Sequence, residues 1–353
     1  MRHELLMTDT DAPMLDQKVK FLSRPNAYPH RAAAVTRRET HMSWVFLVGQ
    51  RVYKLKKPVR FLYLDFSTLD RRETACRAEL ELNRRLAPGV YLDMVPLVAT
   101  HRGLAIGGNG TVVDWLVVMR RLDESQTLEH CIQQRRLSTW QLDRLATTLV
   151  QFYRRAAKIL LLPELYLHGW QHSLRYNCRV LLDPRFGLPA GLIRRIDSAQ
   201  RRFLASRRDV LSARVRGHNI VDGHGDLRPE HIWLGDPVKI IDCLEFNPRL
   251  RAVDPFDEIA YLSLECERLG AVHAGRYIRH RVTRGLRDGL SEELFLFYRC
   301  HRATLRARLA IAHLLEPNPR TPEKWPLLAR DYLRIAAADA IRIERTLKKR
   351  GGR

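Results

Sequence analysis

The stretch that decides the fold is GHGDLRPEHIWL at residues 223–234, followed after the turn at 235–237 by VKIID at residues 238–242. Short apolar runs here alternate with loops, which predicts two short strands flanking loops that are each led by a carboxylate. Asp226 leads the first loop and Asp242 the second. A turn-capping role is the alternative for each, because Asp side chains accept hydrogen bonds from nearby backbone amides.

Helical periodicity surrounds this segment. Apolar residues recur at three- and four-residue spacing over 142–159 and again over 192–211. After residue 257 the chain is predicted to be helical to residue 349, with a break at 316–319 where two prolines occur. These patterns predict a second lobe that is mainly helical.

The first third of the chain predicts a small sheet with one helix. A hairpin is expected from two β-rich runs at 44–48 and 52–56, joined by a compact turn that contains Gly49. An amphipathic helix is expected over 69–86. Further strands are expected at 95–98, 104–106 and 112–119.

These elements predict an α+β fold of two lobes. The N-terminal lobe spans residues 1–120 and is β-rich, with a loosely ordered start over 1–28 that carries two prolines and at most one short helix. The C-terminal lobe spans residues 121–353 and is helical, and it contains the loops led by Asp226 and Asp242.

Charged residues on the predicted hairpin and helix are candidates for a site. Lys54 and Lys56 lie two positions apart on one strand, so both point to the same face, and either could be the functional lysine. Glu79 and Glu81 are the corresponding candidates on the helix. A solvent-exposed position is the alternative for each of these four side chains.

Composition indicates a folded protein without a membrane segment. Hydrophobic residues make up 45% and charged residues 28% of 353, close to the averages for globular proteins. No run approaches the roughly 20 apolar residues that cross a bilayer, and the start lacks the apolar core of a signal peptide. We therefore expect a cytoplasmic protein. The six cysteines lie far apart without zinc-ligand spacing, which predicts reduced thiols.

The net charge of +22 creates a positive field that favours anionic partners, such as nucleotides, nucleic acid or anionic lipid. Charge alone does not choose among them. A solvated basic surface on an enzyme is the alternative interpretation.

The segment HGDLRPEH at 224–231 and the run IIDCLE at 240–245 resemble the catalytic and metal-binding loops of the aminoglycoside phosphotransferase family, whose members are relatives of protein kinases. The resemblance covers about residues 35–308. More narrowly, SWVFL at 43–47, YKLKKP at 53–58 and residues 223–232 look like the kinase-like half of certain two-domain bacterial proteins.

In those bacterial proteins a nucleotide-binding P-loop domain follows the kinase-like half. No GxxxxGKS or GxxxxGKT motif occurs in this chain, so we expect no such second half here.

The resemblance implies a role for each candidate. Asp226 matches the catalytic base and Asp242 the main magnesium ligand, while Glu245 matches a carboxylate that faces or supports the metal. Lys54 matches the strand lysine that binds the nucleotide phosphates, and Glu79 the helix glutamate that pairs with it.

Four further residues receive roles by the same resemblance. Ser43 and Met119 are expected to contact the nucleotide. His224 matches a histidine that braces the loop by hydrogen bonds. Asp257 matches an aspartate that starts a helix and tethers the catalytic loop, although capping alone also explains an acid there.

Two departures from the family pattern stand out. His231 occupies the position of an asparagine that holds a second magnesium ion, and magnesium prefers oxygen ligands, so that ion is expected to be absent, displaced or replaced by manganese. The glycine-rich phosphate loop is also missing. Thr40 and Ser43, with their backbone amides, would have to do its work.

The function implied is ATP-dependent transfer of a phosphoryl group to a hydroxyl of a small molecule, with Mg²⁺ or Mn²⁺ as the metal. The alternative is a catalytically weak or inactive pseudokinase that binds nucleotide and acts as a regulatory module. Nucleic acid is a third expected partner because of the net charge. A polycationic aminoglycoside is a poor substrate for a chain of charge +22, so a neutral or anionic acceptor is favoured.

Overall fold

We describe the fold from a computed structural model that covers residues 13–30, 33–61, 63–316, 319 and 321–351. The chain forms two compact units. The first unit contains the chain up to Glu124 together with Lys239–Pro248, and the second contains Ser125–Val238 and the chain from Arg249 onward.

The first unit is built on a six-stranded antiparallel sheet of order β1-β2-β3-β8-β6-β7. Its strands are β1 (Thr36–Glu39), β2 (Ser43–Val48), β3 (Arg51–Lys56), β6 (Tyr91–Thr100), β7 (Gly103–Ile106) and β8 (Thr111–Arg120). Short elements accompany it: β4 (Arg60–Phe61), β5 (Leu64–Asp65), β11 (Lys239–Ile240) and the 3-10 turn η1 (Pro25–Ala27). The predicted hairpin is confirmed, with Val48 opposite Arg51 across its turn.

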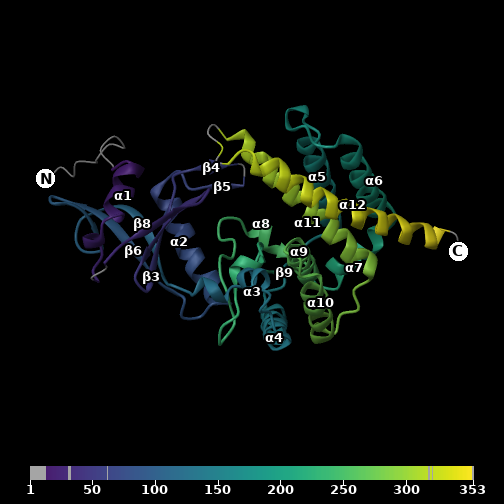
Figure 1. Cartoon of the computed structure of the whole chain (residues 1–353), viewed down its shortest axis with the longest axis horizontal. Helices are drawn as coiled ribbons and strands as arrows, with labels where there is room; N and C mark the ends of the chain where they lie inside the picture. Colours follow the sequence, from purple (N-terminus) through teal and green to yellow (C-terminus); the bar gives the residue numbers. More distant parts are fainter. Residues whose placement is uncertain (1–12, 31–32, 62, 317–318, 320, 352–353) are drawn as a thin grey trace. The chain divides into compact units, whose positions relative to one another are not determined.

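A helix covers each face of this sheet: α1 (Leu15–Leu22) on one side and α2 (Leu69–Arg84) on the other. Figure 1 shows both helices beside β3, β6 and β8. Side chains alternate between the faces of a strand, so Tyr53 and Leu55 of β3 pack in the cluster that α1 closes, while Val52 packs in the cluster that contains α2.

The start of the chain is more tightly packed than expected. Residues 1–12 lie outside the described residues, but Val19, Leu22 and Tyr28 are buried against the sheet. Lys18 of α1 is buried too, and its Nζ lies 2.7 Å from a carboxylate oxygen of Asp114 on β8. The sequence did not predict this packing. The prolines indicate loops, and a helix of eight residues gives only a weak periodic signal.

The second unit is helical. Its helices are α3 (Leu128–Gln133), α4 (Thr139–Arg155), α5 (Pro163–Leu181), α6 (Ala190–Ser206), α7 (Arg208–Arg216), α9 (Pro255–Arg268), α10 (Val272–Leu286), α11 (Glu292–Ala312) and α12 (Lys324–Gly351). The remaining elements are η2 (Glu124–Gln126), η3 (Pro184–Phe186), η4 (Pro229–His231), η5 (His313–Leu315), α8 (Pro248–Arg251), β9 (Val221–Asp222), β10 (Ile232–Trp233) and β12 (Ala252–Val253), of which η2 and α8 span the boundary between the units.

Helices α9 and α11 form the core of this unit, since 12 of the 14 residues of α9 and 15 of the 21 residues of α11 are buried. Helix α12 lies along α11, as Figure 1 shows. Buried ion pairs join these helices. Arg299 of α11 contacts Asp339 of α12, and Arg302 makes two contacts of 2.8 and 2.6 Å with Asp257 of α9.

The structure agrees with the expected α+β fold of a β-rich and a helical part. It differs from the expected division in one segment. Residues 121–353 were expected in one lobe, but Lys239–Pro248 belong to the first unit because Asp242 and Cys243 are hydrogen-bonded there to Tyr91 and Asn83.

All six cysteines are free thiols, as predicted. Among the residues that the structure describes, no helix combines the length and the apolar character that crossing a bilayer requires.

Candidate functional site

The candidate group of the first unit is a lysine–carboxylate cluster made of Lys54, Lys56, Glu79, Asp242 and Glu245. Lys54 and Lys56 are two positions apart on β3, so both side chains leave the sheet on the face that α2 covers. Glu79 lies on α2, whose first turn is capped by the Thr68 side chain. Strand alternation and helix placement therefore bring the three charges together.

Glu79 is shared by the two lysines. Its carboxylate oxygens lie 2.8 Å from Nζ of Lys54 and 2.6 Å from Nζ of Lys56. Nζ of Lys54 is also 2.8 Å from Oδ1 of Asp242, and Lys56 pairs with Glu245. Both Lys54 and Lys56 therefore contact Glu79, so this contact does not choose between them, and Glu79 rather than the exposed Glu81 faces them.

Electrostatics favour the ionised forms of Lys54, Lys56 and Glu79. Burial disfavours the ammonium form of Lys54, but Asp242 and Glu79 outweigh it and hold its pKa well above the ordinary value. Burial works to raise the pKa of Glu79, yet Lys54 and Lys56 hold it below the ordinary value. With all five groups charged, three carboxylates face two ammonium groups, so the cluster carries an excess negative charge that suits a bound cation.

Asp242 is held in an uncommon backbone conformation. Its φ of 63° lies in the left-handed region, which costs a non-glycine residue on the order of 1 kcal/mol or more. Its N–H donates to the Tyr91 hydroxyl at 3.1 Å, and the next N–H donates to Oδ1 of Asn83 at 2.9 Å. These bonds hold the backbone while the carboxylate stays 47% exposed.

Glu245 takes a supporting place in this cluster. Its side chain is 9% exposed and its carboxylate is bound by Lys56. Burial raises the pKa of Glu245 more than the charge of Lys56 lowers it. Of the two roles expected from the sequence, the supporting role fits this placement better than contact with a metal ion.

The candidate group of the second unit is the Asp226 loop, residues 224–231. Both oxygens of the Asp226 carboxylate have partners: Oδ1 accepts from the Tyr261 hydroxyl at 3.2 Å and Oδ2 from Nε of Arg228 at 3.0 Å. Burial works to raise the pKa of Asp226, but nearby positive charge, above all that of Arg228, outweighs it and lowers the pKa. Asp226 is therefore ionised at neutral pH.

His231 lies inside this loop. Its Nδ1 is 2.9 Å from the Asp226 carbonyl oxygen and its Nε2 is 3.1 Å from the Arg228 guanidinium. A carbonyl oxygen only accepts and a guanidinium only donates, so Nδ1 carries the proton and Nε2 is the acceptor. Both nitrogens are engaged by the loop, and the expected metal-ligand role of His231 stays a prediction that this arrangement does not favour.

Glu258, rather than Asp257, secures the base of the loop. The Glu258 carboxylate accepts from the backbone N–H groups of His224, at 2.9 Å, and Gly225, and from the Tyr153 hydroxyl at 2.9 Å. Asp257, the residue expected to tether the loop, instead accepts a hydrogen bond from Arg302. His224 supports the loop as expected, since its Nδ1 accepts from the Asp226 N–H at 3.3 Å.

The two residues expected to contact a nucleotide lie in different surroundings. Met119 of β8 is buried in the cluster beneath the sheet, opposite Val52. Ser43 starts β2, is 2% exposed, and its N–H donates to Oγ1 of Thr40 at 2.9 Å. The Thr40 N–H and hydroxyl both point to the Ser43 carbonyl, so these donors close the turn instead of facing outward.

Sequence reasoning missed several of these groups, namely Arg228, Tyr261, Glu258, Asn83 and Tyr91. Only Arg228 and Glu258 were detectable in principle, since each is a charged residue next to an expected site residue. The other three act from elements far along the chain, and no local pattern marks them.

The candidate metal-ligand side chains, Asp242, Glu245 and His231, differ in how well they suit a divalent cation. Asp242 offers an exposed carboxylate oxygen in a cluster with excess negative charge, which fits one magnesium ligand. Glu245 is bound by Lys56, and His231 offers nitrogen, which magnesium disfavours. The first metal position fits these residues, and the second does not.

No protein-family model matches the chain. Uncharacterized proteins of Mycobacterium tuberculosis and Mycobacterium bovis are each 32% identical to it over 315 residues, covering 86% of this chain and 57% of theirs. The chain therefore spans little more than half the length of the curated relatives it matches.

Solved structures share its fold. A choline kinase from Cryptosporidium parvum aligns with a TM-score of 0.53 at 10% identity, covering 95% of this chain and 97% of its own. The GDP complex of aminoglycoside 2′-phosphotransferase-IIIa gives 0.51 at 16% identity, covering 92% and 99%. A choline/ethanolamine kinase family protein from Mesorhizobium loti gives 0.50 at 14%, also covering 92% and 99%. The chain thus has the protein-kinase-like fold that the sequence resemblance predicted.

Proposed function

On the basis of the protein-kinase-like fold that the chain shares with small-molecule kinases and phosphotransferases, we propose that it is an ATP-dependent phosphotransferase acting on a hydroxyl group of a small molecule. The observation that carries this proposal is Lys54, held 2.8 Å from both Glu79 and the exposed Asp242. Phosphoryl transfer needs such a fixed cation for the phosphates beside a carboxylate that can hold a metal.

Each charged group then has a role. Lys54 binds the nucleotide phosphates, and Asp242 holds Mg²⁺, with Mn²⁺ as the alternative metal. A bound ion supplies positive charge that stabilises the phosphate oxygens during transfer. Lys56 and Glu245 keep Glu79 in place. The expected pairing of Glu79 with Lys54 is supported by their 2.8 Å contact.

Asp226 orients the acceptor hydroxyl and accepts its hydrogen bond. The lowered pKa makes Asp226 a weak base, so its main contribution is to align the oxygen for attack rather than to remove the proton early. The reaction moves the γ-phosphoryl group to the acceptor oxygen, releases ADP, and passes the hydroxyl proton to Asp226 or to water.

The test is Asp226→Asn, with Asp209→Asn as a matched control because Asp209 is an exposed aspartate of the same unit. ATP consumption and phosphorylated products are measured with a pool of hydroxyl-bearing metabolites. We expect turnover to fall by roughly 10²–10⁴-fold in Asp226→Asn, with nucleotide affinity retained. Equal rates in wild type and Asp226→Asn remove Asp226 from catalysis.

A pseudokinase that binds nucleotide without turnover is the second candidate. His231, with both ring nitrogens engaged by the loop, and the closed turn at Thr40 favour it. It predicts nucleotide binding with no product under Mg²⁺ or Mn²⁺. Turnover with either metal that is lost in Asp226→Asn decides for the enzyme.

The net charge of +22 still predicts anionic partners. We propose a neutral or anionic acceptor rather than a polycation, because the positive field attracts anions. Nucleic acid stays a separate prediction, to be tested by DNA and RNA binding at low salt, where phosphate contacts are strongest.

A further inference from the structure

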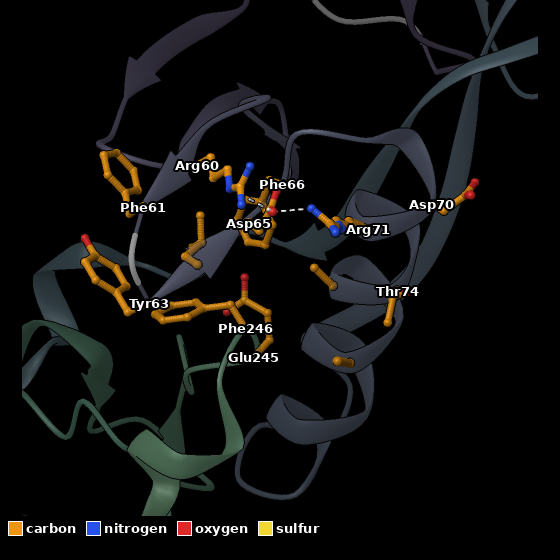
Figure 2. Close-up of a pocket in the computed structure, with 13 residues that line it drawn as sticks. Arg60, Phe61, Tyr63, Asp65, Phe66, Asp70, Arg71, Thr74, Glu245 and Phe246 are labelled. Carbon is orange, nitrogen blue, oxygen red and sulfur yellow. Dashed lines mark hydrogen bonds and ion pairs between the residues drawn. The ribbon is translucent and has the colours of Figure 1, made fainter.

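A large cavity lies in the first unit, apart from the lysine–carboxylate cluster except at Glu245. Its volume is about 1090 Å³, at the upper end of the roughly 300–1,000 Å³ of small-molecule sites. Figure 2 shows its walls: the β4–β5 hairpin, the first turns of α2, and the segment after β11 that carries Glu245 and Phe246. Lys54 and Asp242, which are proposed above to hold the nucleotide phosphates and the metal ion, do not line this cavity.

Aromatic rings form one side of this cavity. Phe61 and Tyr63 stack with ring centres 5.7 Å apart and an angle of 12° between planes. The Tyr63 ring lies 6.0 Å from Phe246, which meets Phe66 edge-on at 6.5 Å. Tyr63 is 41% exposed although it belongs to this chain of rings. A flat ring system can extend such a stack.

Two arginines, Arg60 and Arg71, also line the cavity. Arg60 and Arg71 both meet Oδ2 of Asp65, whose Oδ1 already accepts from the N–H and hydroxyl of Ser67. One carboxylate oxygen cannot use the roughly five N–H donors of each guanidinium. The arginine side chains are 78% and 52% exposed, so donors are accessible to a ligand.

The nearby acidic side chains do not cancel the charge of these two arginines. Figure 2 shows Asp70 directed away from the aromatic side chains, and the Glu245 carboxylate is bound by Lys56. Asp65 pairs with both guanidinium groups.

We propose that this cavity binds a planar aromatic molecule that carries one anionic group. Its rings lie against Phe61, Tyr63 and Phe246, and its anion accepts hydrogen bonds from Arg60 and Arg71. Planar guanidinium groups suit a carboxylate, phosphate or sulfonate, because they donate two parallel hydrogen bonds to it.

The test uses two fluorescent probes with the same rings. 1-Anilinonaphthalene-8-sulfonate carries an anion, whereas N-phenyl-1-naphthylamine lacks it. In titrations of the full chain we expect saturable binding of both and about tenfold tighter binding of the sulfonate, the usual effect of hydrogen bonds to a charged group. Wild type without saturable sulfonate binding overturns the proposal.

Variants locate the site. Arg60→Gln with Arg71→Gln is expected to abolish the preference for the sulfonate while keeping the affinity for the neutral probe. Arg77→Gln with Arg102→Gln removes the same charge from exposed positions outside the cavity and is expected to keep the preference. The proposed site is wrong if the Arg60 and Arg71 double variant keeps the preference for the sulfonate. It is also wrong if the control double variant loses this preference to the same extent.

The aromatic wall has its own variant. Phe61→Ala is expected to weaken both probes by about the same factor, because it removes ring contact but no charge. Unchanged affinity of both probes in this variant overturns the proposed orientation. Circular dichroism of each variant confirms that it is folded. None of these readouts requires phosphotransferase activity, so the proposed function and this site fail independently.

Discussion

The lysine–carboxylate cluster of the first unit and the Asp226 loop of the second unit both hold an aspartate against cations, but they are built differently. Three segments far apart in sequence supply the cluster: β3, α2 and the segment after β11. In the Asp226 loop, by contrast, Arg228 and His231 contact Asp226 from within one stretch of eight residues, 224–231. The cluster depends on tertiary packing, whereas the loop is largely a local structure.

The two aspartates also differ in readiness for ligands. The Asp242 carboxylate is 47% exposed and faces a cluster with excess negative charge, whereas Asp226 is 23% exposed and bound on both oxygens. The Asp242 side chain is thus more accessible than that of Asp226, which Tyr261 and Arg228 hold in place.

The largest expected effect comes from Asp242→Asn, which removes the charge on which metal binding depends. We expect phosphotransfer to fall by about 10²–10⁴-fold and the metal concentration needed for half activity to rise. Asp226→Asn should lower turnover without changing that metal requirement. Asp93→Asn, an exposed aspartate of the same unit, serves as the control. Metal titrations of ATP turnover measure this, and identical metal curves for Asp226→Asn and Asp242→Asn contradict the contrast.

A change in stability follows for Lys56→Met. The variant leaves Glu245 buried without its partner, and breaking a buried pair on one side destabilises a protein by about 3–5 kcal/mol. Urea unfolding measures this. Lys56→Met combined with Glu245→Leu removes both charges and is expected to recover most of the stability. A single variant as stable as wild type shows that the Lys56 pair does not support the cluster.

The smallest expected effect concerns pH. Arg228 lowers the pKa of Asp226, so in Arg228→Ala that pKa rises. Asp226 must be ionised to accept the hydroxyl proton, so the acid limb of the rate profile should move to higher pH. Arg228→Lys keeps the charge and should shift less. Rates measured across pH 4–8 provide the check. If the acid limb does not move in Arg228→Ala, the group whose ionisation sets this limb is not Asp226.

The same charge controls stability. A lowered folded pKa means that the ionised Asp226 stabilises the fold above its unfolded pKa, and this contribution is lost as pH falls through the folded value. In Arg228→Ala the folded pKa of Asp226 rises, so the stabilising contribution of the ionised Asp226 should be lost at a higher pH than in wild type.

Local patterns predicted the elements that carry the site. Alternation and a compact turn predicted the β2–β3 hairpin, and the acidic loops around Asp226 and Asp242 were visible as a break in helical periodicity. The roles of the candidate residues came from resemblance and remain proposals. Short elements such as β4 and β5 were not predicted, because two-residue strands have no periodicity.

Choices between neighbouring residues were less predictable. Asp257 and Glu258 are adjacent on α9, where successive side chains point about 100° apart, so the helix axis and its packing decide which one reaches the loop. Lys54 and Lys56 share a face of β3, and the sequence could not show that one glutamate contacts both.

By itself, the sequence determined which chemical groups this protein has and how they are spaced within each strand, helix and loop, because periodicity and turn chemistry are local. Tertiary structure alone decided which charges meet: Glu79 between two lysines, Glu245 on Lys56, and Glu258 under the Asp226 loop. The physical reason is that Coulomb energies and hydrogen bonds depend on distances of a few ångströms between residues that can be far apart along the chain.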